Sequence, residues 1–291
     1  MARGVKVDTD VIPALSANFQ VNRNTIAEDA FGIATQASIN GGSYTISGSI
    51  GAAYRPTELL PLINLVLGGS DGKMKMDGTF STTTVYIEDD YDNVTTIETA
   101  IINSLEFALA TEDFARITFN YTGTSYASGG SAITSADYTD DLAIFYNALL
   151  TVAGVSVCAK SLTLRIERPL TPDYIIGSEY AVNLNQSGNI TVSGSLGLAA
   201  SEYTLLAAAL TTGDEGELQP RSANKNELTG GTLLINLMHP NGTTAYQTIT
   251  IKNLKITTGS MSAEGRQVAT KNVDFVAAIA STGDVEFGPI T

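Results

Sequence analysis

The densest group of ionisable side chains in the 291-residue sequence is an acidic run over residues 88–93. It holds four carboxylates, those of Glu88, Asp89, Asp90 and Asp92. Crowded carboxylates suit a hard cation such as calcium, but this run lacks the ligand spacing and the glycine of a helix–loop–helix calcium site. We therefore interpret it as the solvated acidic tip of a hairpin and expect no metal site.

Nucleophilic catalysis has few candidates in this chain. A nucleophile–histidine pair would need His239, because the sequence holds one histidine, and the segment His-Pro-Asn-Gly that begins there is typical of a turn. Cys158 lies in an apolar run, which favours a small core residue over an exposed, reactive thiol. The sequence shows neither a Walker loop nor a dinucleotide-binding fingerprint. We expect no enzymatic activity, no catalytic residue and no cofactor.

The charge balance is acidic, because 16 Lys and Arg against 30 Asp and Glu give a formal net charge of −14. Tight binding to nucleic-acid phosphates needs clustered cations, so the chain is not expected to hold DNA or RNA. Residues 1–145 carry 18 of the acidic side chains and residues 146–291 carry 12. The charged N-terminus predicts no secretory signal, and the apolar stretches are too interrupted to predict a membrane span.

An internal similarity indicates how the elements are arranged. Residues 42–51 and 188–197 agree at six of ten positions, and they are separated by about half the length of the chain. The flanking sequences continue this agreement, including an apolar alternation of period two typical of a half-buried strand. We therefore predict two tandem copies of one unit, residues 1–145 and 146–291. The aligned apolar positions are Ala17, Phe19 and Val21 with Leu162, Leu164 and Ile166, and, further on, Ile102, Leu105 and Phe107 with Ile251, Leu254 and Ile256.

Each copy is expected to contain five or six strands and one short helix. In the first copy the helix is predicted over residues 56–67, with Pro56 in the first turn and Gly68 at the end. In the second copy it is predicted over Leu205–Leu210. A connector is expected from about residue 124 to 141, followed by a helix whose face includes Leu142, Ile144, Phe145, Leu149 and Leu150. The predicted strands are 15–21, 42–51, 80–87, 94–107 and 116–121, and then 162–166, 188–197, 232–238, 243–256 and 273–277.

This order of features resembles the tail tube (major tail) proteins of long-tailed, siphovirus-like bacterial or archaeal viruses. The resemblance is carried by an early alternating strand, a glycine-bounded strand ending Ile46-Ser47-Gly48-Ser49-Ile50, a short leucine-rich helix, a hairpin and final strands. It covers nearly all of the chain, twice, and rests on the order of elements more than on signature residues. It implies a mainly β fold of two tandem tail-tube-like β-sandwich or barrel repeats, each with a short flanking α-helix.

The resemblance also implies a function. Six such units form a ring in that family, and stacked rings form a tube around a DNA channel. Two units per chain imply a pseudo-hexameric ring of three chains, located in the virion tail and made in the host cytoplasm. The implied partners are other copies of the chain and the tape measure, tail terminator and tail-tip proteins, with no membrane and no specific binding to the passing DNA.

Acidic channel walls would repel the phosphates of passing DNA, which suits the negative charge of this chain. The candidate channel-facing carboxylates are Glu88, Asp89, Asp90, Asp92, Glu98 and Glu106. An alternative stays open, since strands rich in Ser and Thr are also compatible with an extracellular or surface-layer β-rich binding or structural module.

Overall fold

The computed structural model describes residues 4–28, 38–76, 81–134, 138, 142–144, 148–152, 154–199, 231–238, 245–262 and 270–288. Strands make up most of the described residues, and one α-helix accompanies them, so the predicted mainly β fold is confirmed. The helix predicted over Leu205–Leu210 lies outside the described residues, as do His239 and Phe145.

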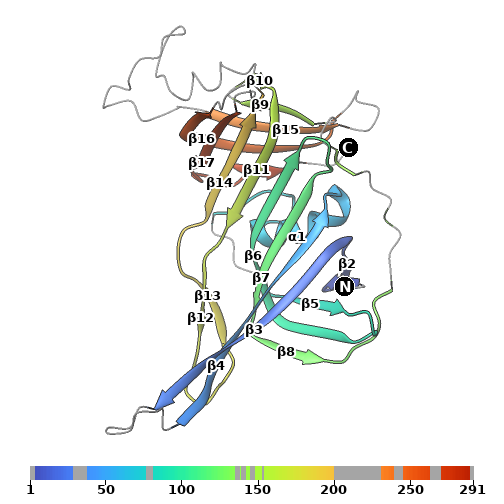
Figure 1. Cartoon of the computed structure of the whole chain (residues 1–291), viewed down its shortest axis with the longest axis vertical. Helices are drawn as coiled ribbons and strands as arrows, with labels where there is room; N and C mark the ends of the chain where they lie inside the picture. The colour runs from blue at the N-terminus through green and yellow to red at the C-terminus, as the bar shows by residue number, and fades with distance from the viewer. Residues whose placement is uncertain are drawn as a thin grey trace.

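The strands of the N-terminal half form one antiparallel path that runs from a short hairpin to a long edge strand (Figure 1). Strand β8 (Ser125–Ser128) lies beside β6, off this path. The order along the path is β2 (Asp10–Val11), β1 (Gly4–Val7), β5 (Thr83–Glu88), β6 (Val94–Ala110), β7 (Arg116–Gly123), β4 (Ser38–Ala53) and β3 (Ala14–Glu28).

The strands of the C-terminal half follow a path of the same order. Strand β18 (Val285–Phe287) lies beside β16, as β8 lies beside β6. A separate ribbon of β12 (Leu170–Asp173) and β13 (Asn183–Gln186) follows β11. The order along the path is β10 (Val155–Val157), β9 (Ala148–Val152), β15 (Gly231–Met238), β16 (Ala245–Ser262), β17 (Thr270–Ala277), β14 (Thr191–Leu198) and β11 (Ala159–Glu167).

The two halves join where β6 pairs with β11, and we call this contact the seam (residues 104–110 with 161–167). The pairing is antiparallel and runs without a register shift. On one side of the seam, Phe107 and Leu164 lie directly opposite each other and both are fully buried. The apolar side chains of both halves belong to one continuous hydrophobic core.

The helix α1 (Pro56–Leu67) packs its apolar face into this core. Its observed bounds match the prediction, and Gly68 ends it in the left-handed conformation, at φ 67°, that glycine adopts without strain. Pro61 lies inside the helix, where its lack of a backbone N–H leaves one carbonyl without the usual helical partner.

Two predictions concern the middle of the chain. The connector expected from about residue 124 contains strand β8, which pairs with β6 through Ser125–Ser128, and the division of the chain near residue 145 stays a prediction. The helix predicted to include Leu149 and Leu150 is instead strand β9, because Leu150 pairs with Ile235 of β15 in the sheet. A short apolar run fits either element, and here a distant strand decides the outcome. Cys158 is exposed, so its expected place in the core is also wrong.

Candidate functional site

The seam has one apolar and one polar side, because successive side chains of a strand point to opposite faces. Leu105 and Leu162 are buried on the core side, whereas Glu106 and Arg165 are exposed on the other. We call this second surface the polar face. Continued through the strands on either side by the register, it includes Ser104, Glu106, Arg116, Thr118, Asn120, Thr163, Arg165, Glu167, Ser193, Ser195, Lys255, Asn272 and Asp274.

The polar face carries charges of both signs, with carboxylates at Glu106, Glu167 and Asp274 and cations at Arg116, Arg165 and Lys255. Arg165 lies opposite Glu106 in the β-ladder and forms an ion pair with Glu167 at 3.1 Å. These side chains are about half exposed, so the pair adds little stability and acts mainly by offsetting the positive charge. Asp274 adds a further carboxylate. The central strands β6, β11, β14 and β17 are therefore acidic on this face, whereas β7 and β16 on either side each add a cation.

Hydroxyl and amide groups occupy much of the rest of the polar face. Thr163 and Ser195 share a hydrogen bond of 2.8 Å across β11 and β14, and the Asn120 amide donates one of 2.7 Å to Ser104. A shallow hollow of about 340 Å³ opens beside them. Such a surface binds water well. The hollow is lined by Glu106, Thr163, Arg165, Ser193, Gly194, Thr257, Asp274, Phe275 and Val276.

The structure separates the six carboxylates that the sequence analysis grouped together. Glu106 lies on the polar face at the seam. Glu98 is exposed earlier on β6, where its carboxylate accepts a hydrogen bond of 3.2 Å from the Ser125 hydroxyl. Glu88 is 3% exposed and accepts one of 3.2 Å from the backbone N–H of Ile133, so it faces no surface of this chain.

Asp89, Asp90 and Asp92 lie in the turn between β5 and β6, so the predicted hairpin is confirmed. The Asp89 carboxylate accepts backbone hydrogen bonds from Tyr91 at 2.8 Å and Asn93 at 2.9 Å. The Asn93 side chain, hydrogen-bonded to the same carboxylate, holds the pKa of Asp89 below its ordinary value. Asp89 therefore shapes this turn. In the described part of the chain, no three His, Cys, Asp or Glu side chains are grouped to hold a metal ion.

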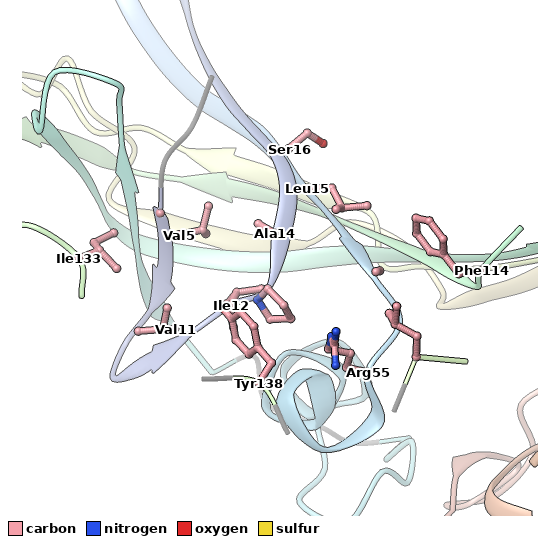
Figure 2. Close-up of a pocket in the computed structure, with 14 residues that line it drawn as sticks. Val5, Val11, Ile12, Ala14, Leu15, Ser16, Arg55, Phe114, Ile133 and Tyr138 are labelled. Carbon is pink, nitrogen blue, oxygen red and sulfur yellow. The ribbon is translucent and has the colours of Figure 1, made fainter. Parts of the chain in front are cut away.

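A larger hollow of about 480 Å³ lies where β3 begins, beside the N-terminus of α1 (Figure 2). Apolar side chains such as Val11, Ile12 and Phe114 line it. Its polar contribution includes Arg55, whose guanidinium lies 5.9 Å from the centre of the Tyr138 ring. The hollow is suited to apolar contact with another surface. The sequence analysis did not foresee it, because its lining comes from segments far apart in the chain.

A family model of phage tail tube proteins matches residues 68–285, more than half of the chain. The chain belongs to the phage tail tube protein family. No curated protein sequence matches it significantly. As a member of this family it is a structural component of the virion tail, and its β-rich architecture agrees with that role. Within the described residues, no helix has the length and hydropathy needed to cross a bilayer.

The tail tube protein also has a projecting arm, which we define as residues 20–28 of β3 and 38–46 of β4 together with the β12–β13 ribbon, residues 170–186 (Figure 1). The two ribbons are held together by an ion pair of 3.1 Å between Arg23 and Glu179. Tyr44 and Tyr180 stack edge to face, with ring centres 4.5 Å apart. The arm is therefore built from both halves of the chain.

Sequence reasoning missed Arg165, Glu167 and Asp274 as members of the polar face. A signal for the first two was present, because the alternation of Leu162, Leu164 and Ile166 assigns the intervening residues to the opposite face. Asp274 follows Val273 in the same way. The sequence could not indicate that β6 and β11 would bring these carboxylates together.

Proposed function

We propose that this tail tube protein is a tandem duplicate whose chains assemble, three at a time, into pseudo-hexameric rings that stack around an acidic channel for DNA, as in a siphovirus-like tail. The observation that carries the proposal is the seam. There, β6, which ends the series β3-β4-β7-β6, pairs with β11, which begins the series β11-β14-β17-β16 of the same order.

The duplication is supported by irregularities that recur in both halves. Chance resemblance between β-rich halves would not reproduce register shifts at the same places, and such bulges are specific features of a strand pair. Non-glycine residues with positive φ recur as well, at Thr99 (49°) and Asn253 (55°). The first recurring shift falls between Ala14 and Ser16 in β3 and between Ala159 and Ser161 in β11. The second falls between Thr83 and Val85 in β5 and between Gly231 and Leu233 in β15. The third falls between Ile102 and Ser104 in β6 and between Ile256 and Thr258 in β16.

The same irregularities correct one alignment of the sequence analysis. Thr99 and Asn253 each lie at a corner, where β6 or β16 stops pairing with its hairpin partner and begins pairing with the next strand. The offset between the copies is therefore 154 residues at these strands. It matches Ile97 with Ile251 and Ile102 with Ile256, where the sequence analysis had matched Ile102 with Ile251.

The channel wall follows from the two faces of the sheet. The apolar side packs into the core with α1, which leaves the polar face for a water-filled lumen. In this proposal Glu106, Glu167 and Asp274 make the wall acidic, so DNA passes without specific binding. The exposed carboxylates Asp90 and Asp92 are the competing candidates, on a different part of the chain.

The arm is the proposed stacking element. Its β12–β13 loop contains Ile175 and Ile176, of which the second is fully exposed. Exposed apolar side chains on a projecting ribbon are suited to contact with the next ring. Assembly in the host cytoplasm, with tape measure, tail terminator and tail-tip proteins as partners and without enzymatic activity, belongs to the same proposal.

Electron microscopy and mass photometry of the purified full-length chain test the proposal. We expect particles of three chains, annular in projection with six lobes and a central hole, and stacks of them at higher concentration. The double variant Ile175→Ser/Ile176→Ser is expected to keep the rings and lose the stacks. A chain that stays monomeric over the whole concentration range contradicts the proposal.

A further inference from the structure

The series of strands β3-β4-β7-β6-β11-β14-β17-β16 ends in two open edges. Strand β3 pairs with β4 on one side, and the described residues place no strand on its other side. Residues 258–262 of β16 pair with β17, and their second side is likewise open within the described chain. The chain therefore has one open edge at each end of the series.

Neither edge carries the features that usually prevent strands from pairing with another molecule. Proteins commonly protect open edges with charged side chains, prolines or very short strands. Residues 14–22 of β3 and 256–262 of β16 contain no charged residue and no proline. Phe19 on the first edge is 38% exposed and Met261 on the second is 58% exposed. Both edges are therefore suited to pairing.

The seam supplies a template for that pairing. The shared bulges match Ser16 with Ser161, and hence Phe19 with Leu164. They also match Ser104 with Thr258, and hence Phe107 with Met261. Leu164 and Phe107 lie opposite each other in the seam and are fully buried. Their counterparts Phe19 and Met261 are exposed, each at an open edge.

We infer that β3 of one chain pairs with the end of β16 of a second copy, antiparallel and in the register of the seam. This inference rests on the proposed ring and names the strands and residues that form its chain-to-chain joint. The resulting pairs are Asn18 with Ser262, Phe19 with Met261, Gln20 with Ser260, Val21 with Gly259 and Asn22 with Thr258.

The joint fits chemically as well as geometrically. It brings Phe19 against Met261, and sulfur–aromatic contacts are favourable. Tyr126, whose ring centre is 6.4 Å from that of Phe19, lies beside them and is 42% exposed in the single chain. On the polar face, Gln20 meets Ser260, a neutral pair where the seam has Arg165 opposite Glu106. No like charges meet in this register.

Each chain uses two different edges, so the contact is heterologous and passes from chain to chain until it closes. The joint therefore differs from the seam in one testable way. The seam lies within one polypeptide, whereas every joint connects two chains, and a covalent link at each joint would tie the whole ring together.

Disulfide trapping tests the register. All variants carry Cys158→Ser, because that exposed thiol would form unrelated links. Gln20→Cys/Ser260→Cys places both thiols at one pair of the joint, within reach of a disulfide. The control, Asn18→Cys/Thr258→Cys, displaces the two thiols by four residues, about 13 Å along the strands. Oxidation of the first variant is expected to give a covalent trimer on denaturing gels, and oxidation of the control is not.

The outcomes separate this inference from the proposed function. If rings form but only the control pair, or neither pair, gives disulfide-linked chains, the proposed register is wrong and the proposed ring is unaffected. Absence of any oligomer from the unmodified chain overturns the proposed function itself.

A charge on the open edge of β3 is a second test. Phe19→Lys is expected to abolish disulfide trapping and assembly, while the far-ultraviolet circular dichroism of the chain stays unchanged. Assembly of Phe19→Lys with normal trapping also overturns the inference.

Discussion

At the scale of single residues, Asp284 organises the turn before β18. Its carboxylate accepts hydrogen bonds from the backbone N–H of Ala280 at 2.8 Å and of Ser281 at 2.7 Å, and from the Ser281 hydroxyl at 2.8 Å. The Asn253 amide donates another of 3.0 Å, at the corner of β16. Burial alone would raise the pKa of Asp284, but these hydrogen bonds outweigh burial and hold it below its ordinary value.

Asp284→Asn is expected to lower the free energy of unfolding by about 1–3 kcal/mol at pH 7, since buried donors lose a charged acceptor. The folded-state pKa is lowered, so the carboxylate stabilises the fold above the unfolded value near 3.8 and loses this effect as the pH falls through the folded value. Urea unfolding at several pH values should show the two proteins converging in acid. Ser281→Ala, which removes one donor, serves as a milder control, and a difference independent of pH would contradict this account.

At the scale of elements, strands β4 and β14, which hold the same place in the two strand paths, each contain a glycine under an aromatic ring. A Cβ at Gly48 would overlap the Asn18 carbonyl and the Tyr121 hydroxyl. A Cβ at Gly194 would overlap the Thr163 carbonyl and the Phe275 ring. The overlapping carbonyls belong to the neighbouring strands β3 and β11, which cannot move without breaking the sheet. Both glycines therefore allow a close approach that a side chain would prevent.

Gly48→Ala and Gly194→Ala are each expected to lower the free energy of unfolding by about 1–3 kcal/mol, the usual cost of overpacking. The same strands offer matched controls. At Gly51 and Gly197 the nearest obstacle to a Cβ is a serine hydroxyl, which can rotate away. Gly51→Ala and Gly197→Ala should therefore cost less than their partners in chemical denaturation. Equal losses at all four positions would show that strand flexibility, not the ring above the glycine, sets the cost.

Elements with a local cause were predictable from the sequence. The helix α1 begins at a proline and ends at a glycine, and both signals act within a turn of the helix. The alternation of Leu162, Leu164 and Ile166 likewise predicted β11 and the side that it buries. The conformation of these residues is determined largely by residues close to them in the sequence.

Other features depend on partners that lie far away in the sequence. Leu150 is in a strand because Ile235 pairs with it, and nothing near residue 150 distinguishes that strand from a helix. Glu88 is buried although three more acidic residues follow closely, because it lies opposite Gly4, whose lack of a side chain leaves room for the carboxylate. The acidic run predicted the turn correctly, but nothing in the run indicated that Glu88 would be buried while the aspartates that follow lie in the turn.

At the scale of the whole molecule, two groups of exposed carboxylates are candidates for the channel wall. The polar face carries Glu106 and Asp274 on either side of one hollow, whereas Asp90 and Asp92 lie exposed in the β5–β6 turn. If the polar face lines the channel, a cation placed on that face contacts the DNA that the wall surrounds. A cation in the turn then lies elsewhere on the assembly. Charge reversal at the two places thus gives different results at the same net charge.

We expect assembled Glu106→Lys/Asp274→Lys to retain duplex DNA at low salt, with the affinity falling steeply as salt rises, as cation–phosphate contacts require. Asp90→Lys/Asp92→Lys changes the net charge by the same amount and should retain little more DNA than the unmodified chain. Co-sedimentation of labelled DNA with the assemblies measures both, after microscopy confirms that each variant still forms rings. Retention by the turn variant alone would place the channel wall on the β5–β6 side. Equal retention by both would mean that net charge, not the position of the wall, controls contact with DNA.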